Sequence, residues 1–149
     1  MRSEEQKSGV IDWRVASRAG VAYTLGVFAF AFVIGAIRVT MVAPWSGELL
    51  AVVLESPIVL AVSWRISLGC SRRFDVRRDP RTRALMGVVA FSVLMSLELG
   101  VALLVFGETL EHYLAKYASI PGVIGLAMQV CFAAIPWIQG LWRSGAGSK

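Results

Sequence analysis

The chain has 149 residues, of which 56% are hydrophobic and 17% are charged, and its mean hydropathy is +0.66. These values exclude an ordinary soluble domain of this size and indicate an integral membrane protein. The length predicts a single membrane domain without a separate soluble catalytic module.

Four apolar runs follow one another along the chain. Each has the length of about 20 residues that a helix needs to cross the hydrocarbon core of a bilayer. In lipid, every backbone amide needs a partner within the protein, and these runs lack the two-residue alternation of barrel strands. The sequence therefore predicts an all-α fold, an integral membrane four-helix bundle. The expected spans are residues 19–37, 47–68, 84–106 and 122–141.

The basic residues predict the orientation of these spans. Of the 15 lysines and arginines, 12 lie before span one, between spans two and three or after span four, and Arg65 lies in the last turn of span two. The other two are Arg38 and Lys116. Under the positive-inside rule, both termini and the arginine-rich loop are therefore expected to be cytoplasmic. A cleaved signal peptide over the first 40 residues is the alternative, which the length of the first apolar run disfavours.

Two connections on the predicted outer side are informative. Residues 39–46 are expected to form a short turn with Pro44, which makes spans one and two antiparallel neighbours. Between spans three and four, apolar and aromatic residues recur at helical spacing, so a short helix is expected on the outer interface. These residues are Leu110, Tyr113, Leu114 and Tyr117. The expected divisions are a cytoplasmic or interfacial N-terminal segment (residues 1–18), one transmembrane domain (residues 19–141) and a cytoplasmic tail (residues 142–149).

Two further features concern the packing of the spans. Small residues at Ala16, Gly20 and Thr24 let the first helix approach a neighbour closely, either within the chain or between subunits. Pro57 and Pro136 lie inside spans two and four, where each removes a backbone hydrogen bond and is expected to kink its helix.

The most specific signal is a set of polar side chains placed inside the apolar spans. Glu48 and Glu55 are seven residues apart, so both project from one face of span two. Glu98 in span three and Gln129 in span four lie at a similar depth below the outer ends of their helices. Arg38, at the outer end of span one, is the only basic residue in the sequence that is close enough in depth to serve them. We therefore expect these five residues to form a cluster in the outer half of the bundle.

This cluster has two interpretations. It is a structural network, as polar residues between membrane helices often are, or it is a binding or proton-relay site, because intramembrane carboxylates are costly and often functional. One arginine cannot balance three carboxylates. At least one glutamate is therefore expected to carry a proton near neutral pH, unless water or a cation fills the site.

The remaining side chains predict neither a metal nor a cofactor. Cys70 and Cys131 are in different spans and form no CxxC pair, and His112 is the only histidine of the sequence. An enzyme is therefore not expected. The net charge is +5, and the basic residues lie mostly in the segments that the predicted topology places in the cytoplasm. The expected partner is therefore anionic lipid at the cytoplasmic face rather than nucleic acid. The arginines expected to contact lipid headgroups are Arg72, Arg73, Arg77 and Arg78.

Several residues form a set that resembles a known family: Arg38, Ala43-Pro44, Gly47-Glu48, Glu55-x-Pro57 and Ser63-Trp64, with Glu98 in the next span. The chain resembles a family of small bacterial inner-membrane proteins with four predicted helices, and the likeness covers most of its length. The resemblance implies a multi-pass protein of the bacterial inner membrane and no particular activity. The small multidrug transporters are similar in size and helix number, but their functional glutamate lies in the first helix, where this chain has no carboxylate. Quinone-linked disulfide oxidases need outer cysteine pairs, which this chain lacks.

Two classes of function remain. A proton- or cation-linked transporter or channel would use the polar cluster as its site, and would work as an oligomer because four helices enclose little aqueous volume. A non-catalytic accessory or assembly subunit would instead use its small-residue faces and its arginine loop to bind a larger membrane complex.

The distribution of basic residues generates a prediction about topology. A reporter fused after Lys149, or inserted within residues 75–80, is expected to be cytoplasmic, and one inserted within residues 108–117 is expected to be external. Enzymatic or fluorescent fusion reporters in intact cells measure this directly. An external signal from the arginine-rich loop would contradict the four-span topology.

Overall fold

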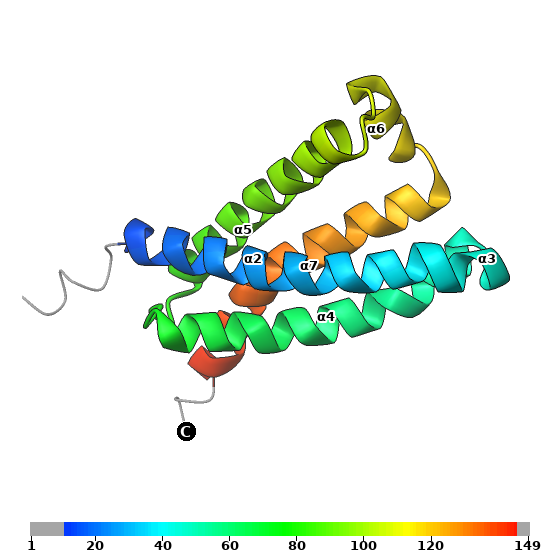
Figure 1. Ribbon diagram of the computed structural model, residues 1–149. Coiled ribbons are helices and arrows are strands. Elements are labelled where there is room, and N and C mark those ends of the chain that lie inside the picture. Colours follow the sequence, from blue (N-terminus) through cyan, green and yellow to red (C-terminus); the bar gives the residue numbers. More distant parts are fainter. Residues whose placement is uncertain (1–10, 146–149) are drawn as a thin grey trace, which may run out of the picture.

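The computed structural model describes residues 11–145, with side chains described as far as Trp142, and every regular element in this part is a helix (Figure 1). Four of the described helices are long and apolar enough to cross a membrane, which confirms the all-α class and the presence of four candidate spans. They cover Trp13–Ser46, Glu48–Arg73, Pro80–Val105 and Ile120–Trp142. Residues 1–10 of the predicted N-terminal segment and residues 146–149 of the predicted tail lie outside the described part.

The first span is longer than its apolar run. Helix α2 (Trp13–Ile37) begins after Asp12, whose carboxylate accepts a hydrogen bond of 3.2 Å from the amide of Val15. It continues through a π-helical segment, η1 (Arg38–Val42), into the short helix α3 (Ala43–Ser46).

The predicted turn at residues 39–46 is therefore helical, and the reversal of the chain occurs at Gly47. Pro44 lies in the first turn of α3, directly after the π-helical segment. Gly47 has a φ of 80°, a conformation that glycine adopts without a steric penalty.

The other three spans are α4 (Glu48–Arg73), α5 (Pro80–Gly100) and α7 (Ile120–Gly145). Asp79 caps α5 by accepting hydrogen bonds from the amide and hydroxyl of Thr82, and a second π-helical segment, η2 (Val101–Val105), extends this helix. Pro57 and Pro136 lie inside α4 and α7. The connection between η2 and α7 contains α6 (Leu110–Lys116), so the predicted short helix is present. Its location on a membrane interface stays a prediction.

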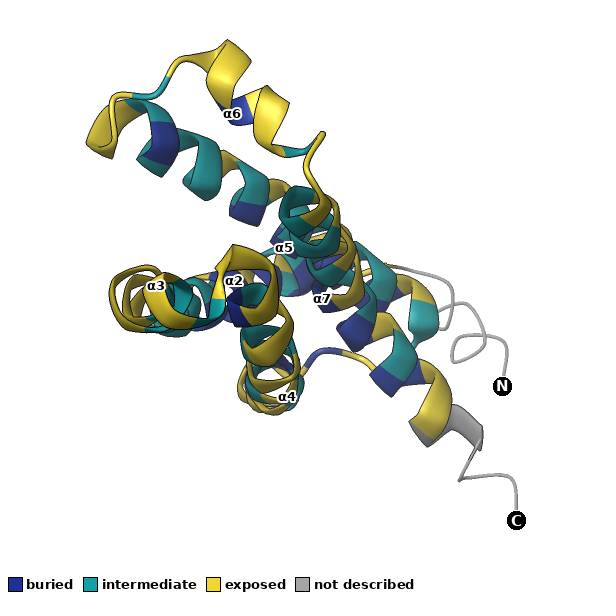
Figure 2. Cartoon of the chain, turned by 90° about the vertical axis from the view of Figure 1, so that its right-hand side faces the viewer, coloured by how far each residue is buried: buried dark blue, intermediate teal, exposed yellow. Residues whose placement is uncertain are grey.

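The long helices form a ring in which each packs against two others. Helix α2 packs against α4 and α5, and α7 packs against the same two helices from the opposite side. We call the end that contains Arg72, Arg73, Arg77, Arg78 and Arg81 the arginine-rich end, and the end with α3 and α6 the opposite end. Figures 1 and 2 show that α5 and α6 diverge from α2, α3 and α4 toward the opposite end.

The buried core lies in the half of the bundle nearest the arginine-rich end. The core cluster combines side chains from α2, α5, the middle of α7 and the connection between α4 and α5. Ala16, Gly20 and Thr24 are all buried there, which places the close approach predicted for them within the chain. An ideal Cβ at Gly20 would lie 2.8 Å from the carbonyl oxygen of Met86, so α2 and α5 almost touch through their backbones.

Buried polar side chains link the helices in the same half. The Thr24 hydroxyl donates to the carbonyl oxygen of Ala90 at 2.9 Å, and the Tyr23 hydroxyl donates to that of Phe132 at 3.0 Å. Gln139 uses both ends of its amide. Its oxygen accepts from Ser67 at 2.9 Å, and its nitrogen donates to the Trp64 carbonyl at 2.9 Å. Such bonds hold membrane helices together because water does not compete for them.

The contact between α5 and α7 generates a stability prediction. A Cβ at Gly87 would overlap the carbonyl oxygen of Ala133, so the two helices can approach this closely only with glycine at position 87. We expect Gly87→Ala to lower the free energy of unfolding by about 1–3 kcal/mol, because the added methyl group pushes the helices apart.

Gly69→Ala is the matched control, because Gly69 is exposed inside α4 and has nothing within 4 Å of an added Cβ. This change is expected to be neutral or slightly stabilising, since alanine favours helices. Unfolding of the purified protein in detergent measures both effects. Equal stability of the two variants would contradict the close packing of α5 against α7.

Candidate functional site

The first polar pair of the predicted cluster joins Arg38 to Glu55. Arg38 is the first residue of η1, and its Nε lies 2.7 Å from Oε2 of Glu55 on α4. The two side chains are 23% and 17% exposed, so the pair is largely removed from solvent. The Nε–H group is not aligned for a hydrogen bond, so the contact is stabilised by the attraction between the two opposite charges. The pair connects α2 to α4.

The second polar pair joins Glu98 to Gln129. The amide nitrogen of Gln129 on α7 donates to Oε2 of Glu98 on α5 at 2.5 Å. The amide oxygen of Gln129 is buried and has no hydrogen-bond partner among the described residues. Within the described part of the chain, Glu98 forms no ion pair with a basic side chain. The carboxylate of Glu98 thus has a neutral partner, whereas that of Glu55 has a cationic one.

The five predicted residues therefore occur as two separate pairs and one isolated side chain. Glu48 is the first residue of α4, where it is exposed. No hydrogen bond or ion pair of the described residues joins the Arg38–Glu55 pair to the Glu98–Gln129 pair. One pair lies between α2 and α4 and the other between α5 and α7, and α5 diverges from α2 and α4 toward the opposite end (Figure 1).

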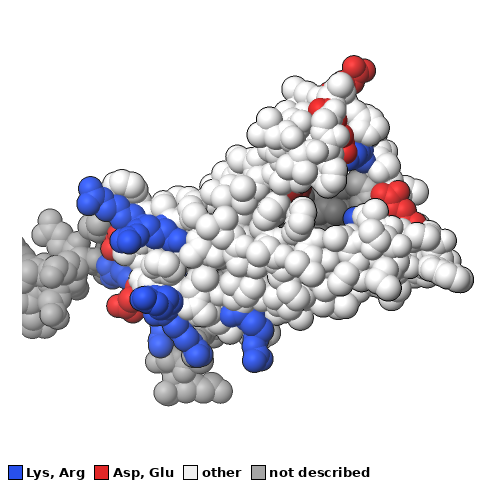
Figure 3. Space-filling view, viewed as in Figure 1, with Lys and Arg blue, Asp and Glu red and all other residues white. Residues whose placement is uncertain are grey.

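Helix α6 and the connection before it add polar groups that were not among the five predicted residues. Figure 3 shows that the surface is hollowed at the opposite end, with acidic and basic atoms around the hollow. Tyr113 is buried, and its hydroxyl lies 2.8 Å from that of Tyr117. Lys116 donates to Oε1 of Glu108 at 2.5 Å, while Oε2 of Glu108 is buried without a partner among the described residues.

Burial and the hydrogen bond with Tyr117 raise the pKa of Tyr113 above its usual range. Tyr113 is therefore protonated and neutral at physiological pH. The carboxylates of Glu98 and Glu108 also contribute to this shift, so the tyrosine lies within electrostatic reach of both. The helical spacing of Tyr113 was visible in the sequence, but its proximity to Glu98 depends on how α6 folds back over the bundle.

Both π-helical segments occur beside these polar pairs. η1 begins with Arg38, and η2 begins three residues after Glu98. Single-turn π segments inside α-helices frequently accompany functional sites, because the wider turn redirects a side chain and leaves backbone groups with altered partners. No residue type marks such a turn in the sequence, so these segments were not predicted.

The other candidate residues are not part of the two polar pairs. Cys70 and Cys131 are free thiols, His112 is exposed, and no three His, Cys, Asp or Glu side chains of the described residues are grouped as metal ligands would be. The predicted lipid-contacting residues Arg72, Arg73, Arg77 and Arg78 are exposed at the arginine-rich end. The chain matches no known family model, no curated protein and no solved structure.

The Arg38–Glu55 pair generates a second stability prediction. Arg38→Ala leaves the Glu55 carboxylate largely buried without its cation. We therefore expect a loss of about 1–3 kcal/mol, between the values typical of exposed and of fully buried pairs. Arg65→Ala, which removes an exposed arginine from α4, is expected to have little effect. Unfolding in detergent compares the two variants.

A second substitution separates the ion pair from packing. Adding Glu55→Gln to Arg38→Ala is expected to restore part of the lost stability, because the uncompensated charge is removed. Additive losses in the double variant would show that the two side chains do not interact energetically.

Proposed function

We propose that this multi-pass membrane protein transports protons or cations across the bacterial inner membrane, alone or coupled to a solute, with Glu98 as the working carboxylate. The observation that carries the proposal is the pairing of Glu98 with the neutral amide of Gln129 inside candidate spans. Glu98 is half-buried, and a carboxylate removed from water is costly unless its charge is neutralised. Glu98 therefore needs a proton or a cation, and exchange of that species is the elementary step of transport.

Glu55 has a different role in this proposal. Its charge is balanced by Arg38, so the pair holds α2 against α4 and contributes a fixed dipole to the outer half of the bundle. The neutral Tyr113 supplies a hydrogen-bonding group on the other side, as do the oxygens of Gln129 and Glu108 that have no partner among the described residues. These groups can bind water that carries protons between Glu98 and the surface.

The working unit is proposed to be an oligomer, without catalytic activity as an enzyme. Four helices enclose little aqueous volume, and here α5 diverges from α2 and α4 at the end where the polar pairs lie (Figure 2). A second copy would close this opening and separate the hydrated side chains from lipid.

The same divergence favours one alternative. A helix of a larger membrane complex would also fit between α5 and the α2–α4 pair at this end, and this chain would then be an accessory or assembly subunit. In that case the two polar pairs would bind the partner or fix helix register, and no transport would depend on titration of Glu98.

Proton flux in proteoliposomes tests the proposal. Under an imposed pH gradient, the unmodified protein is expected to dissipate the gradient or to couple it to uptake of a solute. Glu98→Gln is expected to abolish this signal, because it keeps the size and hydrogen bonding of the side chain but removes its titration. Glu55→Gln is expected to reduce the signal by leaving Arg38 unbalanced.

Glu48→Gln is the matched control, because Glu48 is an exposed glutamate at the start of the same helix as Glu55. It is expected to leave flux unchanged. If the Glu98 and Glu55 variants fold normally and transport as well as the unmodified protein, the site is structural and the accessory role is favoured.

A further inference from the structure

A cationic pocket lies at the arginine-rich end, where α4 ends and α5 begins. Its volume is about 560 Å³, and its lining includes four arginines, Arg72, Arg77, Arg78 and Arg83, together with Asp75. The basic side chains at this end are visible in Figure 3. Guanidinium groups match the geometry of phosphates and carboxylates with pairs of parallel donors, so such a pocket suits an anion such as a phosphate group.

The burial of Arg83 distinguishes this pocket from a patch of exposed surface charge. It is 4% exposed, and its Nη1 donates to the Ser71 hydroxyl at 3.2 Å. A Cβ at Gly140 would lie 3.0 Å from Cδ of Arg83, so α7 packs directly on the alkyl part of this side chain. The fold thus holds one buried cation in the wall of the pocket, while the other three arginines lie at its surface.

A second, aromatic groove of about 210 Å³ adjoins this pocket between α4 and α7. Trp64 and Trp142 contact each other edge to face in its wall, with ring centroids 6.0 Å apart. Gln139 also lines it, but both polar atoms of its amide are already engaged with Ser67 and Trp64. The groove therefore offers mainly apolar and aromatic surface.

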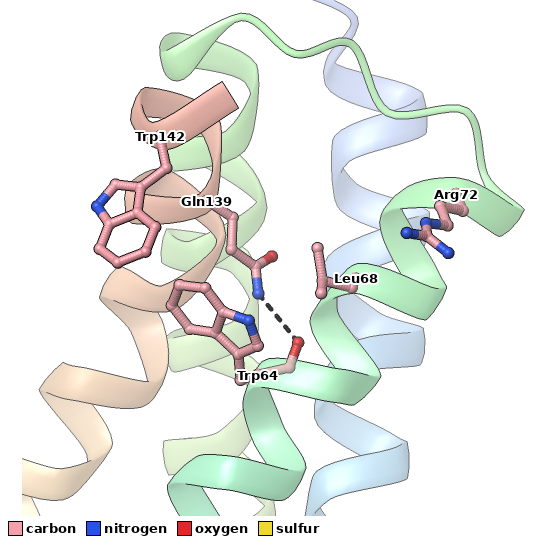
Figure 4. Close-up of a pocket in the computed structure, with 5 residues that line it drawn as sticks. All are labelled: Trp64, Leu68, Arg72, Gln139 and Trp142. Atoms are coloured by element: carbon pink, nitrogen blue, oxygen red, sulfur yellow. Dashed lines mark hydrogen bonds between the residues drawn. The ribbon is translucent and has the colours of Figure 1, made fainter. Parts of the chain in front are cut away.

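The two hollows share Leu68 and Arg72. Figure 4 shows Leu68 between the Arg72 guanidinium and the two indole rings. Along α4, Trp64 and Arg72 are eight residues apart, which corresponds to about 12 Å. This distance is long enough to reach from the lipid headgroups into the hydrocarbon core. Tryptophan is enriched at the boundary between headgroups and hydrocarbon, and arginine is enriched in the cytoplasmic loops beside it.

We propose that one anionic glycerophospholipid binds specifically across both hollows. Its phosphate contacts Arg72, Arg77 and Arg78 in the field of the buried Arg83, and one acyl chain lies along Leu68 and the two tryptophans. This proposal goes beyond general contact of loop arginines with lipid, because it assigns one site. It also excludes Arg73, which does not line the pocket. A free phosphate shares the headgroup chemistry but has no group to fill the aromatic groove.

Lipid binding to the full chain in detergent tests this proposal. Native mass spectrometry and thermal unfolding are measured with added phosphatidylglycerol, phosphatidylcholine, glycerol 3-phosphate or inorganic phosphate. We expect phosphatidylglycerol to bind most tightly and to raise the melting temperature. Arg72→Gln with Arg78→Gln is expected to weaken this binding at least about tenfold, the effect of losing one charge-assisted hydrogen bond.

Arg14→Gln with Arg18→Gln is the matched control, because it removes two exposed arginines from the start of α2 outside the pocket. This variant is expected to bind phosphatidylglycerol as the unmodified chain does. Trp142→Ala is expected to weaken binding of phosphatidylglycerol while leaving that of glycerol 3-phosphate unchanged.

Three results would overturn the proposal. Equal losses in the two double-arginine variants would show general attraction to the basic end instead of one site. Equal affinity for glycerol 3-phosphate and the lipid, together with no effect of Trp142→Ala, would identify a free phosphate as the ligand. Equal binding of phosphatidylglycerol and phosphatidylcholine would show that the arginines do not recognise an anionic lipid. An acidic segment of a partner protein would then be the favoured ligand of the pocket. The melting temperatures without lipid verify that each variant is folded.

Discussion

The close backbone approach of α5 to α2 and α7 is the constraint on which the rest of this structure depends. Lipid tails are as apolar as leucine side chains, so membrane helices gain little from burying apolar surface against each other and rely on packing at short range and on interhelical hydrogen bonds. Gly20 and Gly87 bring backbones into contact at two such points, and the Thr24 hydroxyl adds a bond to the Ala90 carbonyl. These contacts lie in the half of the bundle nearest the arginine-rich end, which is therefore the closed half.

The opposite half is open because it lacks equivalent contacts. The buried core ends near Val27 on α2 and Leu94 on α5, below the level of Arg38 and Glu98. The divergence of the helices there separates two polar pairs that share a similar depth, and it leaves buried oxygens of Gln129 and Glu108 without partners among the described residues. The closed half and the open, polar half belong to the same four helices, so the proposed exchange of protons or cations in the open half would leave the packing of the closed half intact.

The closed half also creates the cationic pocket. Gly140 lets α7 pack on the side chain of Arg83, and this contact directs the guanidinium toward Ser71 rather than into solvent. The chain from Asp75 to Arg78 then adds further charge beside this buried cation. Asp75 has a positive φ of 51°, a conformation that aspartate tolerates better than most residues, and it lets the connection turn sharply enough to line the same pocket.

The amino-acid sequence by itself determined the helical class, the four candidate spans and the short helix between the last two, because a backbone in lipid has few alternatives to a helix. It also identified Arg38, Glu55, Glu98 and Gln129 as unusual. The pairing of these residues was decided by the tertiary structure, since counting along a helix gives depth but not the direction in which a side chain projects around the bundle. That rotation depends on which helices touch at Gly20 and Gly87, and the π-helical turn at Arg38 changes it further. For the same reason, the sequence did not identify the buried polar residues Ser71, Arg83 and Gln139. They belong to the polar interior only because α4, α5 and α7 pack together.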